Sequence, residues 1–153
     1  MREFLKKTYL FSELEDPELD CVSGRLKRHE FGAGERIIQE NEPADRCYMI
    51  LSGTVRVTSS FSGKEDFFTI LNPGDHFGEI SLIDGLAPSA TVLAEEATTA
   101  LSISHDDLKV FLEKDPRLAG KLLLAMLRAL CHRLRETDQS LAFTRFMMRQ
   151  EHS

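Results

Sequence analysis

Cysteine is scarce in this sequence, and long apolar runs are missing. Cys21, Cys47 and Cys131 are odd in number, lie far apart and form no CxxC motif. That argues against a disulfide framework, a zinc ribbon or a four-cysteine iron–sulfur cluster. No stretch reaches the roughly 18 to 20 apolar residues of a membrane span, and the opening MREFLKKTYL lacks the apolar core of a secretory signal. We therefore expect a protein of the reducing cytoplasm with no membrane partner.

Positive charge is also in deficit. The chain has 19 Lys and Arg against 25 Asp and Glu, a net charge of −6, which makes non-specific binding to nucleic acid over its whole surface a poor prospect. Its 153 residues, 42% hydrophobic, are enough for about one domain whose core needs no disulfide or metal. We expect one domain over residues 1–153. It has a helical segment at 1–30, a β-rich part at 31–103 and helices at 104–143.

The first segment carries helix start signals. Ser12 and Glu15 have the spacing of a capping box, and Asp16-Pro17 fits an N-cap followed by proline at the first helical position. Apolar residues then recur at roughly helical intervals. The pattern predicts helix up to about residue 28.

The middle of the chain predicts an all-β sandwich or barrel. Short apolar or alternating runs are cut by glycine and proline about every ten residues. Val55 and Val57 alternate with polar neighbours, which indicates a sheet with one face in water. The expected strands are 36–38, 47–51, 54–58, 67–71, 90–94 and 100–103.

The last part predicts two helices. Ser104-His105-Asp106-Asp107 is typical of a helix cap, and Asp115-Pro116 predicts the start of a longer helix that runs to about residue 143. Two apolar stripes lie along this longer helix and need two partners. One is a seam with spacings of four and three residues: Leu123, Leu127, Leu130, Leu134, Thr137 and Leu141. The other is Leu118, Leu122, Ala125 and Ala129.

We expect one stripe to pack on the protein's own β-structure and the leucine seam to pair with a second copy in a homodimer. The alternative is a monomer in which this helix is buried on all sides. That alternative would bury Arg128, Arg133 and Arg135, which is unfavourable in a single core.

Turn chemistry is densest in residues 72–94, NPGDHFGEISLIDGLAPSATVLA. A short helix opened by Gly78 would present free N–H groups, and a turn with the Ser89 hydroxyl and the Ala90 N–H could complete a phosphate cradle. Glu79 would be unwelcome beside a phosphate but could bind a neighbouring sugar hydroxyl. The plainer interpretations are a glutamate that stabilises the helix dipole and an ordinary turn serine.

These motifs resemble the cyclic-nucleotide-binding domains of the catabolite-activator and protein-kinase-A regulatory family. FGAGERII at 31–38 is similar to the family's first strand of the roll, and residues 41–57 resemble its central strands. PGDHFGEISL at 73–82 resembles the opening of its phosphate-binding cassette, and RLRET at 133–137 its long dimerisation helix. The resemblance covers nearly the whole chain. It implies an eight-stranded antiparallel β-roll (a double-stranded β-helix or jelly-roll) with an N-terminal helix and a long C-terminal dimerisation helix.

The resemblance also implies a ligand, cAMP or cGMP or a related anion, and no cofactor. It implies that Glu79 holds the ribose 2′-hydroxyl, that Ser89 and Ala90 contact the cyclic phosphate, and that Thr137 and Asp138 lie where the helix meets the base. The full candidate set, within a cassette at 77–91 and on the long helix, is Phe77, Gly78, Glu79, Ile80, Ser81, Pro88, Ser89, Ala90, Arg133, Thr137 and Asp138.

One cassette position departs from the family. Pro88 stands where the family has the arginine that pairs with the phosphate, and proline has neither that charge nor an N–H donor. Loss of such a contact costs roughly 1.5 to 3 kcal/mol, or about ten- to a hundredfold in affinity. Arg133, Arg46 or Arg56 could compensate. The alternative is a degenerate domain with an empty pocket that serves as a dimeric protein-interaction module.

Catalysis and DNA binding are not expected. Pro73-Gly74-x-His76 is a partial cupin pattern, but the chain has no HxH pair, and a lone histidine such as His76 is seldom a metal ligand. Residues 117–153 hold seven Lys and Arg and three Asp and Glu, which fits the outside of a coiled-coil helix. The family's bacterial regulators place a helix-turn-helix domain after this helix, whereas this sequence stops at Ser153. We therefore expect no direct sequence-specific DNA binding, and a downstream protein as a further candidate partner.

Overall fold

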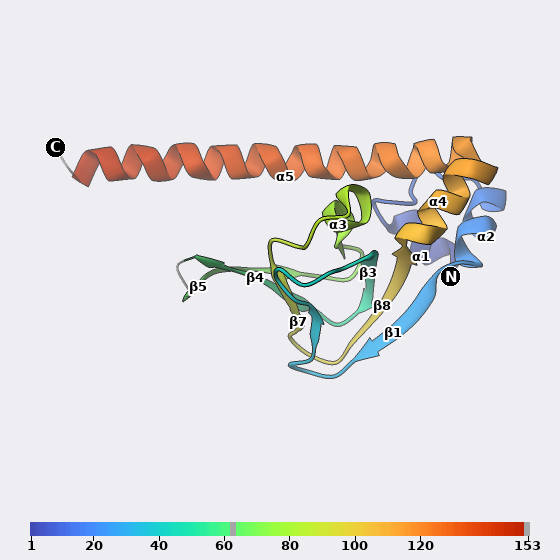
Figure 1. The fold of residues 1–153 in the computed structure, drawn as a ribbon, viewed down its shortest axis with the longest axis horizontal. Coiled ribbons are helices and arrows are strands. Elements are labelled where there is room, and N and C mark those ends of the chain that lie inside the picture. Colours follow the sequence, from blue (N-terminus) through green and yellow to red (C-terminus); the bar gives the residue numbers. More distant parts are fainter. Residues whose placement is uncertain (62–63, 152–153) are drawn as a thin grey trace.

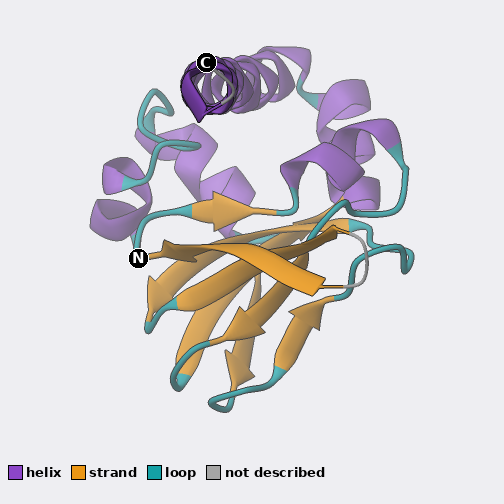
Figure 2. Ribbon diagram, turned by 90° about the vertical axis from the view of Figure 1, so that its left-hand side faces the viewer, coloured by secondary structure: helices purple, strands orange, loops and turns teal. Residues whose placement is uncertain are grey.

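Two antiparallel four-stranded sheets form a roll, and the helices gather along one side of it (Figures 1 and 2). The computed structural model describes residues 1–61 and 64–151. One sheet has the order β1 (Lys27–Phe31), β8 (Thr98–Ser104), β3 (Arg46–Ser52) and β6 (His76–Phe77). The other has the order β2 (Arg36–Ile38), β7 (Thr91–Ala94), β4 (Val55–Phe61) and β5 (Lys64–Leu71). The predicted eight-stranded β-roll is confirmed.

Five helices are described, and the last is by far the longest. They are α1 (Arg2–Lys7), α2 (Asp16–Ser23), α3 (Glu79–Asp84), α4 (His105–Lys114) and α5 (Pro116–Glu151). α5 runs along the top of the roll, and its second half extends past the other helices (Figure 1). None of the described helices combines the length and apolar character needed to cross a bilayer.

Strand β3 separates two cores because successive side chains of a strand point to opposite faces. Cys47 and Met49 belong to a large core shared with the helices. Ile50 faces the other way, into a smaller core inside the roll that includes Val55 and Phe77. The helical layer is therefore held to the roll by apolar burial, mainly through β3 and β8.

The N-terminal helix start differs from the prediction. The capping residue of α2 is Glu15, which forms a reciprocal capping box with Glu18. The predicted caps, Ser12 and Asp16, do not act as caps: the Ser12 hydroxyl donates instead to the Tyr9 carbonyl at 3.2 Å, and Asp16 is already helical. A carboxylate can accept from N–H groups at a helix start as serine does, so the helix begins one acidic residue earlier.

Two strands were not predicted. β1 begins at Lys27, inside the segment predicted as helical, and its residues Lys-Arg-His-Glu-Phe are mostly charged and exposed. β6 has only two residues, His76 and Phe77, after a tight turn at Pro73-Gly74. Neither strand is long enough or apolar enough to leave an alternating pattern.

The C-terminal helices follow the prediction closely. Ser104 caps α4, and its hydroxyl accepts from the Asp107 N–H at 3.1 Å. The Asp115 carboxylate accepts from the Leu118 N–H at 3.1 Å and opens α5, which continues to Glu151, beyond the predicted end near residue 143.

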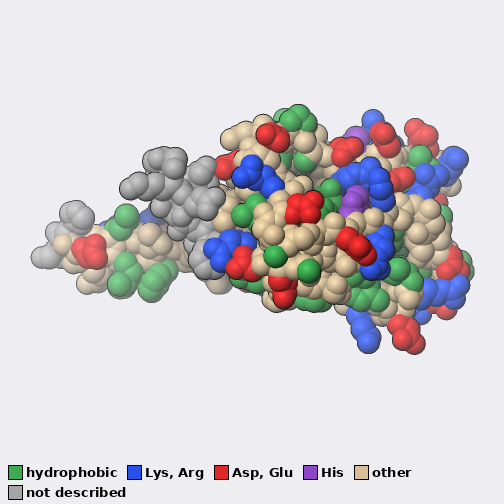
Figure 3. Space-filling view, turned by 90° about the horizontal axis from the view of Figure 1, so that it is seen from below, with side chains coloured by type: hydrophobic (Ala, Val, Ile, Leu, Met, Phe, Trp, Pro, Cys, Tyr) green, Lys and Arg blue, Asp and Glu red, His purple; other side chains and the backbone are tan. Residues whose placement is uncertain are grey.

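One stripe of α5 is buried, and the leucine seam is open in part, because Leu123 packs against the large core and Leu130 is half-buried. Leu118 and Leu122, with Ala119 and Met126, lie in the large core, so packing of this stripe on the protein's own body is confirmed. In the leucine seam, Leu127, Leu134 and Leu141 are 54%, 61% and 47% exposed in the single chain. The second half of α5 also exposes apolar side chains at its far end, including Phe143, Phe146 and Met147, and this end projects from the body in Figure 3.

Candidate functional site

A cavity of about 910 Å³ lies between the roll, α3 with its following loop, and α5. Its volume is within the range usual for small-molecule sites. The roll supplies an apolar wall of Ile38, Val57, Leu71, Phe77 and Val92. The opposite wall comes from the cassette and from α5. It carries most of the polar groups of the cavity, together with apolar cassette residues such as Ile80, Leu86 and Pro88.

Gly78 sets the direction in which the cassette enters the cavity. Its φ of +88° lies in the left-handed region, which residues with a side chain rarely adopt. A Cβ at this position would lie 2.5 Å from the Arg46 carbonyl oxygen and 3.3 Å from a terminal methyl of Ile38. Only glycine therefore lets α3 start this close to β3, and this start places Glu79 at the cavity wall.

Glu79 is the central polar group of the site. It is only 1% exposed, although it lines the cavity. Its Oε1 accepts a hydrogen bond from Nη1 of Arg133 on α5, and Nη2 of the same guanidinium donates to the His76 carbonyl at 2.9 Å. Its Oε2 has no hydrogen-bond partner among the described residues. A buried carboxylate oxygen without a donor is unfavourable, so a donor that reached this oxygen would stabilise it.

Burial favours the neutral forms of two titratable side chains near Glu79, the His76 imidazole and the Cys47 thiol. Burial lowers the pKa of the His76 imidazole, although the Glu79 carboxylate acts in the opposite direction. Burial also raises the pKa of the Cys47 thiol, and the charge of Glu79 adds to that rise. The Glu79–Arg133 pair therefore supplies the charge at this end of the cavity.

Ten of the eleven candidate ligand residues line the cavity. These are Phe77, Gly78, Glu79, Ile80, Ser81, Pro88, Ser89, Ala90, Arg133 and Thr137. Asp138 is exposed and is not among the lining residues. The sequence reasoning missed Asp84 in the cassette and Glu136, Gln139 and Ser140 on α5. Helical spacing from Arg133 could have indicated Glu136 and Ser140, which lie three and seven positions further on.

The proline position is fixed by the backbone around it. The Pro88 carbonyl accepts a hydrogen bond from the Asn41 N–H at 3.0 Å, and Asn41 itself has a φ of +65°. This contact ties the cassette loop to the turn after β2. Pro88 therefore lines the cavity without offering it a charge or an N–H.

Two of the three arginines that could compensate for Pro88 lie elsewhere. Arg56 is held by a two-bond contact with Glu95, at 2.9 and 2.8 Å. Arg46 donates to the Ser102 hydroxyl at 3.2 Å and pairs with Asp45 at 3.8 Å. Of the three, Arg133 alone lines the large cavity.

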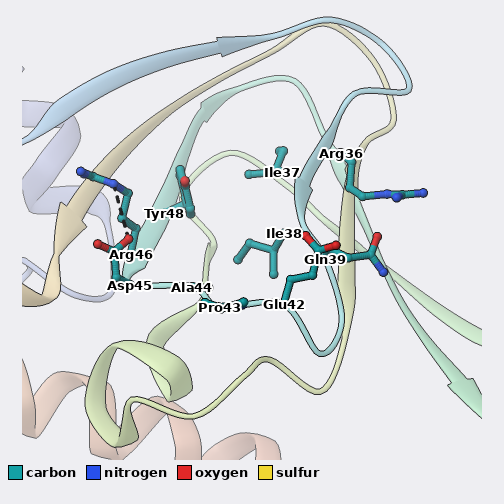
Figure 4. A pocket seen from close by; sticks show the side chains of 10 residues that line it. All are labelled: Arg36, Ile37, Ile38, Gln39, Glu42, Pro43, Ala44, Asp45, Arg46 and Tyr48. Carbon is teal, nitrogen blue, oxygen red and sulfur yellow. Dashed lines mark ion pairs between the residues drawn. The ribbon is translucent and has the colours of Figure 1, made fainter.

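Arg46 lies instead at a smaller cavity of about 300 Å³. In Figure 4, Arg46 and Asp45 lie at one end of this cavity and Arg36 at the other, with Ile38 and Tyr48 between them. Ile38 is shared by the walls of both cavities. The smaller cavity thus lies beside the site and leaves the charge of Arg46 outside it.

Comparison with known proteins gives a consistent result. Residues 28–115 match the sequence model of the cyclic nucleotide-binding domain. The chain is 33% identical over 145 residues to the CRP-like cAMP-activated global transcriptional regulator of Mycobacterium tuberculosis, with 93% of this chain and 62% of the relative covered. It thus spans a little under two thirds of that relative's length.

Solved structures give the same picture. The catabolite activator protein of Thermus thermophilus is 30% identical with a TM-score of 0.79, over 91% of this chain and 64% of that one. A cyclic nucleotide-binding domain from Methylobacillus flagellatus is 28% identical with a TM-score of 0.78, over 88% and 76%. Both likenesses extend over most of the chain.

Proposed function

Because the chain belongs to the cyclic nucleotide-binding domain family, we propose that it is a ligand-responsive regulatory domain whose large cavity receives a ribose-bearing ligand of the nucleotide class, with cAMP and cGMP as the first candidates. The observation that carries the proposal is Glu79, a buried carboxylate on the cavity wall with one oxygen unpartnered among the described residues. A ribose hydroxyl is a donor of the right kind for that oxygen.

The cavity lies between two helices, α3 and α5, and both contribute side chains to it. Glu79 belongs to α3, whereas Arg133, Thr137 and Ser140 belong to α5. A ligand bound to Glu79 and touching these α5 side chains favours one position of α5 over others, and a ligand shifts an equilibrium by its difference in affinity between states. The first turns of α5 are fixed in the core by Leu118 and Leu122. The response therefore concerns the half of α5 that follows Met126.

The open leucine seam supports a homodimer as the acting form. Leu127, Leu134 and Leu141 recur every seven residues on the exposed side of α5. Such a stripe pairs with a second helix in a coiled coil. Pairing of two α5 helices would transmit a ligand-dependent change in one copy to the other, and from there to a downstream protein.

A second candidate function is supported by Pro88. Without the cassette arginine, and with Arg133 already bonded to Glu79, the described lining residues offer a phosphate no cation that is not already paired. The domain would then act through its helices as a dimeric protein-interaction module with no nucleotide bound.

The experiment is a calorimetric titration of the purified protein with cAMP, cGMP, adenosine and guanosine, compared with Glu79→Ala. Glu95→Ala is the matched control, because Glu95 is an exposed carboxylate bonded to Arg56 and lies off the cavity. Micromolar binding of any of the four that weakens at least tenfold in Glu79→Ala and not in Glu95→Ala supports the ligand-responsive function. No heat with any of them up to millimolar concentration contradicts it and favours the interaction module.

A further inference from the structure

The charges on the cavity wall disfavour an anionic ligand. Of the described lining residues, three carry carboxylates, Glu79, Asp84 and Glu136, and one carries a guanidinium, Arg133. With all four ionised, this part of the wall has a net charge of −2. A cyclic nucleotide carries a negative charge on its phosphate, and like charges in a partly closed site repel.

The guanidinium is not available to balance a phosphate. Arg133 uses one nitrogen for Glu79 and another for the His76 carbonyl. If Arg133 turned to a phosphate, the Glu79 carboxylate, which is 1% exposed, would lose its only charged partner among the described residues. A buried carboxylate stripped of its partner is strongly unfavourable, so the pair holds Arg133 in place.

The cassette offers no substitute for that charge. Pro88 has no N–H, and its carbonyl is turned to the Asn41 N–H. α3 has only six residues, with the Glu79 carboxylate in its first turn, so its dipole is small and already offset. Arg46 and Arg56 are held by Asp45, Ser102 and Glu95 and do not line this cavity.

The remaining wall fits a neutral molecule with hydroxyl groups and a flat apolar part. Oε2 of Glu79 is buried without a donor among the described residues, and it would accept from a hydroxyl that reached it. Ser89, Thr137, Gln139 and Ser140 offer uncharged donors and acceptors along the polar wall. The apolar wall of the roll can cover a planar base.

Resting on the proposed function, we propose that the preferred ligand is an uncharged purine nucleoside, and that the same nucleoside carrying a 3′,5′-cyclic phosphate binds more weakly. The nucleoside places a ribose hydroxyl against Glu79 while Arg133 keeps its bond to the other carboxylate oxygen. The position occupied by Pro88 is then the determinant that excludes the phosphate.

The test is the order of affinities in the unaltered protein, measured by calorimetry. Adenosine and guanosine are each expected to bind at least tenfold more tightly than cAMP and cGMP, and 2′-deoxyadenosine at least tenfold more weakly than adenosine. Pro88→Arg is expected to strengthen cAMP binding about ten- to a hundredfold with little change for adenosine. Pro88→Gln, which adds a long side chain without charge, should leave cAMP binding unchanged.

The outcomes separate this inference from the function on which it rests. Binding of cAMP or cGMP as tight as that of the nucleosides, in the unaltered protein, overturns the inference and leaves the ligand-responsive function standing. Absence of binding by all four compounds overturns both. If Pro88→Arg does not fold, as judged by circular dichroism, the order of affinities in the unaltered protein still decides.

Discussion

Arg133 and Glu79 lie 54 positions apart in the chain, yet their side chains form an ion pair that joins α5 to α3 at the wall of the large cavity. The glutamate is buried, whereas the arginine side chain is 41% exposed. The pair therefore links an element fixed to the roll with the half of α5 that has few other contacts with the body.

Loss of the arginine is expected to destabilise the protein. Arg133→Ala leaves the Glu79 carboxylate buried without a cation, and this should lower the free energy of unfolding by about 1 to 3 kcal/mol, since the partial exposure of Arg133 reduces the full effect for a buried pair. Urea unfolding measures it. Arg128→Ala is the control, because Arg128 lies on the same helix as Arg133 and its pair with Glu13 is exposed, with side-chain exposures of 52% and 65%. It should change stability by less than about 1 kcal/mol. Equal effects of the two variants would contradict the structural role given to the Arg133–Glu79 pair.

Two glycines with nearly equal backbone angles provide a matched comparison. Gly78 has a φ of +88° and Gly74 a φ of +93°, so alanine has a similar conformational cost of about 1 to 2 kcal/mol at either position. A Cβ at Gly74 meets no atom within 4 Å, whereas one at Gly78 meets the Arg46 carbonyl at 2.5 Å. Gly78→Ala should therefore lower stability clearly more than Gly74→Ala, by roughly a further 1 to 3 kcal/mol, in urea unfolding. A loss of stability in Gly78→Ala no larger than that in Gly74→Ala would show that the β3 backbone at Arg46 moves aside at little cost.

Stability is expected to fall as the pH drops below about 6.5. Burial lowers the pKa of His76 in the folded protein below its ordinary 6.5. The unfolded chain then takes up a proton first, and stability decreases from pH 6.5 down to the folded pKa. At pH 5.5 the loss is at most about 1.4 kcal/mol from this residue. His29, whose pKa burial also lowers, adds a share of its own.

His76→Gln should remove part of that pH dependence in urea unfolding at pH 7.5, 6.5 and 5.5. His132→Gln is the control, since the His132 side chain is 75% exposed on α5. It should leave the change of unfolding free energy with pH the same as in the unaltered protein. The same slope in His76→Gln as in the unaltered protein would mean that His76 does not contribute.

The leucine seam predicts a dimer that charge can break. Leu127→Glu combined with Leu134→Glu puts like charges on both helices of a paired seam, and sedimentation velocity should then show half the mass of the unaltered protein. Leu112→Glu is the control, because Leu112 is 46% exposed on α4, away from the seam. A mass unaffected by the double substitution would argue against pairing through this face.

The parts of the fold that the sequence predicted are those with a local signal. The capping residues at Ser104 and Asp115 and the alternating apolar strands each follow from a few neighbouring residues. β1 was not predicted because it lies at a sheet edge and its residues are mostly charged. β6 was not predicted because two residues are too few to show an alternating apolar pattern. The exact cap of α2 depends on which of several neighbouring acidic and polar residues reaches the N–H groups, and spacing alone does not decide this.

In the candidate site, too, the residues with a local sequence signal could be predicted and those that depend on tertiary packing could not. The cassette is one continuous stretch, so its lining residues could be named together. The residues of α5 reach the cavity only through the crossing of two elements, and successive residues of a helix turn by about 100°. This turn separates Thr137, which lines the cavity, from Asp138, which does not. The bond of Arg133 to Glu79 depends on tertiary packing, and no local pattern indicates it.

The anchoring of α5 at one end makes it a mechanical lever. Its 36 residues span about 54 Å, and roughly 38 Å of that length lies beyond Met126, the last residue of α5 in the large core. A tilt of about 10° at that pivot would move the far end by roughly 7 Å, from simple geometry of that length. Arg133 lies about 10 Å beyond the pivot and Ser140 about 21 Å, so a displacement at Arg133 is amplified about three- to fourfold at the tip and one at Ser140 about twofold.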